Sequence, residues 1–390
     1  CILIGLSGCT TLPQRSVDPI PLPGAFSNSG ETPADVRWWL TFNDSALTQY
    51  IETALSSNFS LLATRERIVQ AQAVAKQAGA ALIPSLDGEG SASRNRDYDS
   101  NINNDNFSLG LAAAYEVDLW GRLRNIKDAA RLDLKATQAD FATAQLSLSS
   151  EVALVWFQVT EAEQQLLLLH KQKETNEKVL EVISTQFRSG KTDISDVLQQ
   201  RQLVESNRGA LAKLHADKRI FEQQLAILLG QTPEKSIAEK MQELPNLPQL
   251  PVTGIPVELV TKRPDVNASF VRLQATDQRS AAAVASRFPR LSLTASFYTS
   301  GNSAKDLFSN WFSTLAANLF GPIIDGGYLK AEVEKTQSLA RQQLHSYSQT
   351  ILEAIGEIEN SLVRENQLLQ SLESEKIQLQ LATETIEHVG

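Results

Sequence analysis

Apolar and polar residues follow a helical period over most of the chain but change to alternation in four short segments. Apolar side chains occupy every second position from Phe107 to Val117, which predicts a strand with one apolar face. The segment 86–96 alternates more weakly, with small residues on its apolar side, and is expected to pair with that strand. Segments 291–298 and 311–319 repeat the alternation. The pattern therefore predicts two β-hairpins, at 85–118 and 290–323.

Long helices are predicted on both sides of these hairpins. Residues 122–189 contain neither Gly nor Pro, and a helix of this length would extend about 100 Å. Another helix is predicted from Asp44, a good N-cap residue, to about Leu82, and a returning helix from Ile194 to Leu229. A last helix begins near Tyr328 and continues to the end of the sequence. Such helices are expected to pack side by side as in coiled coils.

The predicted elements occur twice. Pro84 and Pro289 stand 205 residues apart, as do Gly121 and Gly326, and the same shift relates residues 59–121 to the second copy. The predicted domains begin with a residual signal peptide at 1–8 and a lipid anchor with an extended tether at 9–43. A first repeat follows at 44–230, with its helical hairpin at 122–229. An equatorial connector at 231–257 then leads to a second repeat at 258–390, with its long helix at 326–390. The second repeat is expected to be truncated, because the equivalent of the Gly190 turn would fall near residue 395.

Composition and hydropathy narrow the classes of function. The net charge of −9 and the lack of any Lys/Arg cluster argue against a nucleic-acid partner. No run of about 18 apolar residues occurs, so a membrane span would have to use the strands. Four strands cannot close a barrel, and open sheet edges are not tolerated in lipid, so such a span requires several copies of the chain. Two copies would supply about eight strands and three about twelve, and spacing alone does not choose between them.

One face of the predicted sheet is the candidate membrane surface. A soluble β-sandwich would also alternate, but hairpins separated by long helices offer no second sheet for packing. The side chains expected to face lipid are Phe107, Leu109, Leu111, Tyr115, Leu291, Leu293, Phe297, Trp311 and Leu315. Aromatic rings near strand ends suit either the membrane interface or ordinary packing, and these are Tyr115, Trp120, Tyr298, Trp311 and Phe312.

No enzymatic or metal site is predicted. Gly190-Lys191-Thr192 is similar to the end of a phosphate-binding loop, but Thr185 stands where that loop needs Gly, and the preceding segment is helical. The histidines lack metalloprotease spacing and are expected to have surface or packing roles; they are His170, His215, His345 and His388. No nucleophile motif is present, so we expect no enzyme, no cofactor and no metal.

The N-terminus resembles a bacterial lipoprotein signal. Leu6-Ser7-Gly8-Cys9 is similar to a lipobox and closes an apolar stretch that ends in small residues. The resemblance implies cleavage before Cys9 and acylation of that cysteine. The other interpretation is a short apolar terminus that holds a chance cysteine. Residues 10–33 carry five prolines without an apolar period, which predicts an extended tether.

An ordered series of motifs across nearly the whole chain resembles the TolC family of outer membrane factors, in its lipoprotein efflux-channel branch (NodT/OprM-like). The motifs are Leu6-Ser7-Gly8-Cys9, Trp38-Trp39-x-x-Phe42-x-Asp44-x-x-Leu47, Asp118-Leu119-Trp120-Gly121-Arg122, Arg263-Pro264-Asp265-Val266, Phe288-Pro289-x-Leu291 and Ile324-Asp325-Gly326-Gly327. The resemblance implies an α+β membrane protein that forms a homotrimer. Three chains, each giving four strands, would build one transmembrane β-barrel, which a long α-helical coiled-coil barrel would continue across the periplasm.

The function implied by the resemblance is that of the outer membrane channel in a tripartite efflux system. The channel would conduct small molecules passively while docked to a periplasmic adaptor (membrane fusion protein) and an inner-membrane pump of the RND or a similar type. Its location would be the cell outer membrane, where it is lipid-anchored and extends into the periplasm.

The resemblance also assigns roles at the turn between the two paired helices. It implies that the adaptor contacts Arg188, Ser189, Gly190, Lys191, Thr192 and Asp193, and that Asp196 matches the family's gate aspartate. Copies of one carboxylate around a narrow pore repel one another and bind cations. In a second interpretation, Asp193 or Asp196 caps the returning helix, and the two roles are compatible.

Two other functions stay open. The same family also includes ducts for type I protein secretion, and a lipid-anchored periplasmic coiled-coil scaffold without a pore would share the long helices. The Trp-Trp motif, the Arg-Pro-Asp-Val motif and the lipobox favour the efflux branch, whereas the four amphipathic strands favour a duct over a scaffold. None of these motifs identifies the transported substrate.

Overall fold

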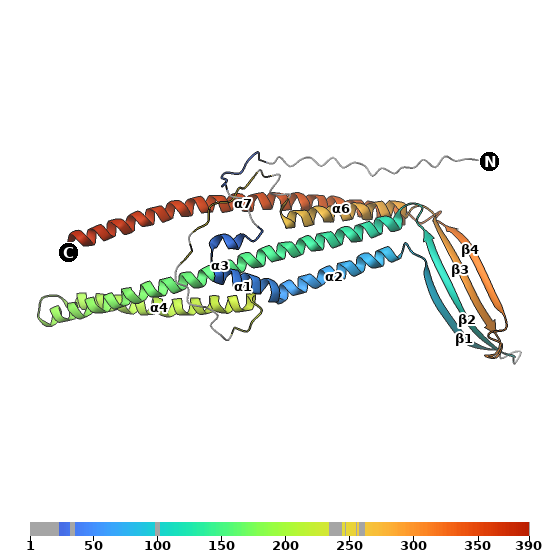
Figure 1. Ribbon diagram of the computed structural model, residues 1–390, viewed down its shortest axis with the longest axis horizontal. Helices are drawn as coiled ribbons and strands as arrows, with labels where there is room; N and C mark the ends of the chain where they lie inside the picture. The colour runs from blue at the N-terminus through green and yellow to red at the C-terminus, as the bar shows by residue number, and fades with distance from the viewer. Residues whose placement is uncertain are drawn as a thin grey trace. The chain divides into compact units, whose positions relative to one another are not determined.

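The structure is a computed structural model that describes residues 23–31, 36–97, 102–233, 244–245, 247–254, 256 and 262–389 (Figure 1). The predicted signal peptide, Cys9 and about half of the predicted connector lie outside these residues. Internal contacts divide the chain into two compact units. The sheet unit comprises residues 1–27, 67–140 and 255–390, and the hairpin unit comprises residues 28–66 and 141–254. The domain division by repeats stays a prediction.

The sheet unit contains one antiparallel sheet of four strands in the order β1-β2-β3-β4 (Figure 1). The strands are β1 (Ser85–Asp97), β2 (Ile102–Val117), β3 (Arg290–Gly301) and β4 (Trp311–Phe320). The alternation thus predicts both hairpins, and pairing of β2 with β3 joins the two repeats in one sheet. Gly110 permits this pairing, because a Cβ there would lie 2.6 Å from the Cβ of Tyr298.

The turns from strand to helix are held by aspartates. Before α3 (Arg122–Arg188), Asp118 accepts hydrogen bonds from the backbone N–H groups of Leu123 and Arg124, each at 3.0 Å. Trp120 donates to the carbonyl of Pro289 at 2.7 Å and stacks on Phe288, so this aromatic side chain has the packing role that the sequence left open. Before α7 (Tyr328–Val389), Asp325 accepts from the N–H groups of Gly327 and Leu329.

Helix α6 (Pro264–Ala285) lies along α7 in the sheet unit (Figure 1). Val266 on α6 packs with Ile351 and Ala354 on α7. Arg263, just before α6, donates at 2.7 Å both to Asp265 and to Glu357 on α7. The Arg-Pro-Asp-Val motif therefore joins the start of α6 to α7.

The hairpin unit is built on the distal part of α3 and the returning α4 (Ile194–Leu228). The 3-10 helix η1 (Trp38–Phe42), α1 (Ser45–Ser57) and the first residues of α2 (Phe59–Ala80) belong to the same unit. Their shared core contains Trp39, Leu47, Ile51, Leu61, Leu148, Val152, Trp156, Leu225 and Leu229. Asp44 caps α1 through the N–H groups of Ala46 and Leu47 and also accepts from the indole N–H of Trp156 at 2.8 Å.

The single helix predicted from Asp44 to Leu82 is wrong, because the chain breaks at Asn58 into α1 and α2. The backbone of Asn58 is extended, and its side-chain oxygen accepts from the N–H of Leu61 at 3.0 Å. Its amide group donates to the carbonyl of Leu228 at 2.9 Å, at the end of α4. Asn can replace backbone hydrogen bonds in this way, so a tertiary contact decides the break.

The helices are long without being apolar. Helix α3 has 67 residues, which corresponds to about 100 Å of helix. Within the described part of the chain, no helix combines the length and hydropathy needed to cross a bilayer.

Candidate functional site

The strand register brings all nine predicted lipid-facing residues to one face of the sheet. Leu109 lies opposite Thr299, Leu111 opposite Phe297, and Tyr115 opposite Leu293. On the next pair, Thr299 lies opposite Trp311 and Ala295 opposite Leu315. Since directly paired residues point to the same side of a sheet, the apolar sets of β2, β3 and β4 form one surface, here called the apolar face.

The apolar face is exposed in a single chain. Leu315 is 84% exposed, and Leu111 and Trp311 are about half exposed, at 51% and 48%. The rings of Phe297 and Trp311 stack at 4.7 Å beside a shallow hollow of about 380 Å³. Leu109, Leu111, Gly88 and Gly90 also line this hollow. A contiguous apolar surface of this kind needs an apolar covering, because exposing it to water is unfavourable.

The opposite face of the sheet is mainly polar. Ser292, Thr294 and Ser296 on β3 pair with Glu116, Ala114 and Ala112 on β2. Besides small alanines, this face carries two aromatic residues, Tyr298 and Phe312, whose rings stack at 5.4 Å. Two sides of such different polarity suit a sheet that lies between lipid and water.

An ion pair lies on the apolar face near the turn between β1 and β2. Arg94 donates through Nε and Nη2 to the two carboxylate oxygens of Asp105, each at 2.6 Å, and the two residues are register partners. Leu109, four residues further along β2 from Asp105, is already part of the apolar face. The apolar residues are therefore bounded by charge at this end.

The predicted adaptor-contact turn follows α3 directly and has a defined backbone geometry. Gly190 has a φ of +70°. Its N–H donates a hydrogen bond to the carbonyl of Phe187 at 2.9 Å, and the N–H of Lys191 donates one to the carbonyl of Gln186 at 2.9 Å. This pair of hydrogen bonds is the Schellman motif, which needs a left-handed residue at the position of Gly190. Arg188, Ser189, Lys191, Thr192 and Asp193 are placed around this glycine.

Asp193 and Asp196 form a capping box at the start of α4. Asp193 accepts from the N–H of Ser195 at 3.0 Å, and Asp196 accepts from the N–H of Asp193 at 3.3 Å and from the Thr192 hydroxyl. The backbone N–H of Ser195 is the main cause that lowers the pKa of Asp193 below its ordinary value. The interpretation that Asp193 and Asp196 cap the returning helix is thus confirmed within a single chain.

Asp196 also borders a polar hollow of about 610 Å³ between the ends of α3 and α4. Glutamines dominate its lining, together with Thr192, Ile183 and Leu203. The carboxylate is therefore held at the turn by hydrogen bonds while it remains exposed to solvent. That placement leaves it available for interactions with other copies of the chain.

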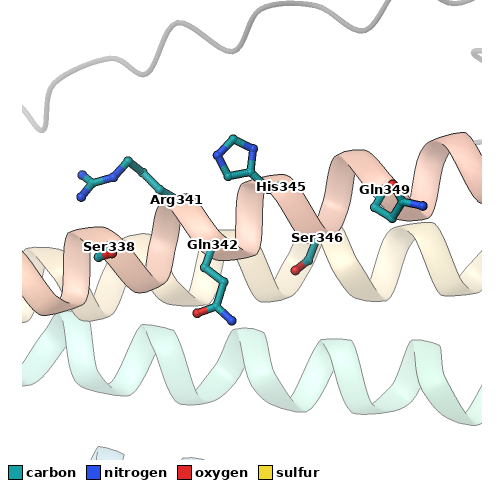
Figure 2. A pocket seen from close by; sticks show the side chains of 6 residues that line it. All are labelled: Ser338, Arg341, Gln342, His345, Ser346 and Gln349. Atoms are coloured by element: carbon teal, nitrogen blue, oxygen red, sulfur yellow. The ribbon is translucent and has the colours of Figure 1, made fainter.

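A second polar hollow, of about 710 Å³, lies along α7 and is open to solvent. Figure 2 shows Arg341 and His345 pointing to one side of α7 and Gln342 and Ser346 to another. The remaining lining residues are Ser338 and Gln349. In the described part of the chain, no three or more His, Cys, Asp or Glu side chains are grouped as metal ligands.

The structure brings together two residues that the sequence treated separately. The ring centres of His170 on α3 and His215 on α4 lie 6.1 Å apart. Their separation of 45 residues matches no local metal-binding spacing. The signal that could have paired them is the turn, because both lie nearly equally far along their helices from the Gly190 region.

Comparisons with known proteins agree with this architecture. A sequence profile described as "Outer membrane efflux protein" matches residues 50–231 and 255–388. The chain is 34% identical over 378 residues to the "Pyoverdine export outer membrane protein OpmQ" of Pseudomonas aeruginosa, covering 93% of this chain and 79% of that protein. It is 28% identical over 400 residues to "Nodulation protein T" of Rhizobium leguminosarum bv. trifolii, covering 98% of this chain and 84% of that protein.

Solved structures show the same fold. A crystal structure of CusC superposes with a TM-score of 0.84 at 25% identity, covering 93% of this chain and 85% of CusC. The open state of the Neisseria gonorrhoeae MtrE outer membrane channel gives a TM-score of 0.83 at 24% identity, covering 93% of this chain and 83% of MtrE. The fold class expected from the sequence is confirmed.

Proposed function

The chain belongs to the outer membrane efflux protein family, and on that premise we propose that it is the outer membrane channel of a tripartite efflux system. The family consists of outer membrane channels rather than enzymes. In the proposed assembly, a homotrimer conducts small molecules passively while docked to a periplasmic adaptor and an inner-membrane pump. An acylated Cys9 would anchor each chain to the membrane.

The apolar face is the observation that carries this proposal. It is continuous over β2, β3 and β4 and bounded by a charged pair. Within one chain, β1 and β4 form the edges of the described sheet. Lipid does not tolerate such edges, so pairing of β4 with β1 of the next copy would close the sheet. A scaffold without a pore gives no reason for this face.

The turn at Gly190 is the proposed contact with the adaptor, and Asp196 the proposed gate residue. The Schellman motif and the capping box fix the backbone around the turn, so its exposed side chains are preorganised for a partner. Symmetry copies of the Asp196 carboxylate would repel one another and attract cations.

The names of the relatives do not point to one cargo. One relative is named for pyoverdine export and another for cation efflux. Since proteins of one fold bear such different names, we infer that the pump selects the substrate and that the channel provides the exit.

Leu315→Arg tests whether the apolar face meets lipid. If this face meets lipid, arginine near the bilayer midplane costs about 2–4 kcal/mol, so outer-membrane trimers should fall sharply in amount. The matched control is Thr314→Arg, which puts the same charge on the opposite face of β4 and should still assemble. The measurement is the heat-labile trimer in outer-membrane fractions and its conductance in planar bilayers. Equal assembly of both variants would favour the scaffold without a pore.

Asp196→Asn tests the gate while keeping an oxygen that can accept the capping hydrogen bonds. Removing the charge should raise single-channel conductance and weaken block by cations, because the ring of carboxylates is lost. Asp193→Asn is the control, since it removes a neighbouring charge from the same capping box and should leave conductance unchanged. Identical conductance and cation block in wild type and Asp196→Asn would remove Asp196 from the gate.

A further inference from the structure

Polar side chains join α3 and α4 at intervals of seven residues in the hairpin unit. The positions are Glu163, His170 and Glu177 on α3, and Arg208, His215 and Glu222 on α4. Arg208 lies 3.3 Å from Glu177, and Lys218 bridges from Glu163 toward Glu222. Oppositely charged groups thus join the helices on both sides of the central pair. The central pair instead consists of two histidines.

We propose that His170 and His215 form a binding site for a borderline divalent transition cation such as Zn²⁺ or Cu²⁺. Imidazole nitrogen is a preferred ligand of both ions. With Zn–N bonds of about 2.0–2.1 Å, two rings that share one ion have their centres roughly 5–6 Å apart. The observed separation of 6.1 Å and the angle of 65° between the rings lie near this arrangement. Small side-chain rotations would therefore bring one nitrogen of each ring to the ion.

The surroundings of the pair suit a bound cation. Both histidines are exposed, so water can complete the coordination shell that two protein ligands leave open. The Gly190 turn and the flanking ion pairs hold the two helices in register. The two rings are therefore already near each other, and little conformational freedom is lost when they bind an ion. This site would link α3 to α4 in addition to the ion pairs.

Three of the nearby positive charges are paired with carboxylates. Lys218, one turn along α4 from His215, is paired with Glu163, and Arg219 lies 3.1 Å from Glu222. On α3, Lys173 lies 3.6 Å from Glu177. These pairings reduce the repulsion that a cation would meet between the two rings. The prediction that the protein has no metal site considered each histidine separately, whereas the fold places His170 beside His215.

Titration of the detergent-solubilised protein with Zn²⁺ in a calorimeter tests the site. We expect one Zn²⁺ per chain, with the affinity at least tenfold weaker in His170→Gln and in His215→Gln. The matched control is His345→Gln, which removes an exposed histidine of α7 and should change the affinity less than twofold. Mg²⁺ should not compete, because it prefers oxygen ligands.

Thermal unfolding gives a second readout that also verifies folding of the variants. Zn²⁺ should raise the midpoint in wild type and in His345→Gln but in neither variant of the pair, since only a ligand bound to the folded state stabilises it. The same Zn²⁺ affinity in wild type and in both pair variants would overturn the proposal. So would an equal loss of affinity in His345→Gln, which would indicate unspecific binding to surface histidines. Neither outcome depends on channel activity, so the proposed function is tested separately.

Discussion

Helices α2 and α6 occupy equivalent positions in the two repeats but have different environments. Both have 22 residues, and the shift of 205 residues relates Phe59–Ala80 to Pro264–Ala285. Helix α2 buries a single residue, Leu61, whereas α6 buries ten. Leu61 and Val266 correspond in the repeat and are both buried, so the two helices share only the start of their buried surface.

The difference arises from neighbours as well as from sequence, because apolar residues gather on one face of α6 more than on one face of α2. Helix α6 packs along α7 and forms ion pairs with α3 through Arg272 to Asp140 and Arg279 to Asp133. On α2, Val69 and Val74 are 52% and 53% exposed. Both helices are rich in alanine, which allows close packing but does not require it.

The largest expected effect comes from placing a charge at one repeat position in both helices. Ala275 on α6 is fully buried, and its equivalent on α2 is the exposed Gln70. Ala275→Glu should lower the free energy of unfolding by about 3 kcal/mol or more, because the carboxylate is buried without a partner. Gln70→Glu should change it by less than about 0.5 kcal/mol. Urea unfolding followed by far-UV circular dichroism measures both. Equal destabilisation would mean that α2 is as enclosed as α6.

A smaller effect, dependent on pH, is expected at the start of α6. Burial alone would raise the pKa of Asp265, but hydrogen bonds and charge from Arg263 outweigh it and lower the pKa below its ordinary value. Stability from a lowered pKa is present above the unfolded value and is lost as pH falls through the folded value. Asp265→Asn should therefore cost about 1 kcal/mol or less near neutral pH, and progressively less below about pH 4.

Urea midpoints measured between pH 7 and pH 3 check this expectation. The equivalent position on α2 is Ser60, which does not titrate in this range, so Ser60→Asn is the matched control. A difference between wild type and Asp265→Asn that stays constant over the whole range would contradict the assigned ion pair.

The smallest effect separates Arg272 from Arg67, its equivalent on α2. Arg272 pairs with Asp140 at a partly exposed site, so Arg272→Ala should cost about 0.2–1 kcal/mol. Arg67 has no ion-pair partner among the described residues, and Arg67→Ala should stay within about 0.5 kcal/mol of wild type. A double-mutant cycle with Asp140→Ala measures the pair directly. A coupling energy of zero would remove this ion pair from the explanation of why α6 is enclosed.

Much of the candidate site could be predicted from sequence because its signals are local. Alternation of side chains identified the apolar face, since successive residues of a strand point to opposite sides. Gly190 was placed at the turn because it ends a long stretch without Gly or Pro, and Asp193 and Asp196 because either could cap the returning helix. The break at Asn58 was missed, since its hydrogen bond to Leu228 joins residues that are far apart in the chain.

The sequence by itself determined most of the elements, the polarity of each strand face and the chemistry of the turns. These properties depend on residues within one helical turn or a few strand positions. The tertiary structure alone decided that β2 pairs with β3, that α6 is enclosed while α2 is exposed, and that His170 lies beside His215. The physical reason is that burial and side-chain pairing depend on which segments become neighbours in space, and the pattern within one segment does not specify its neighbours.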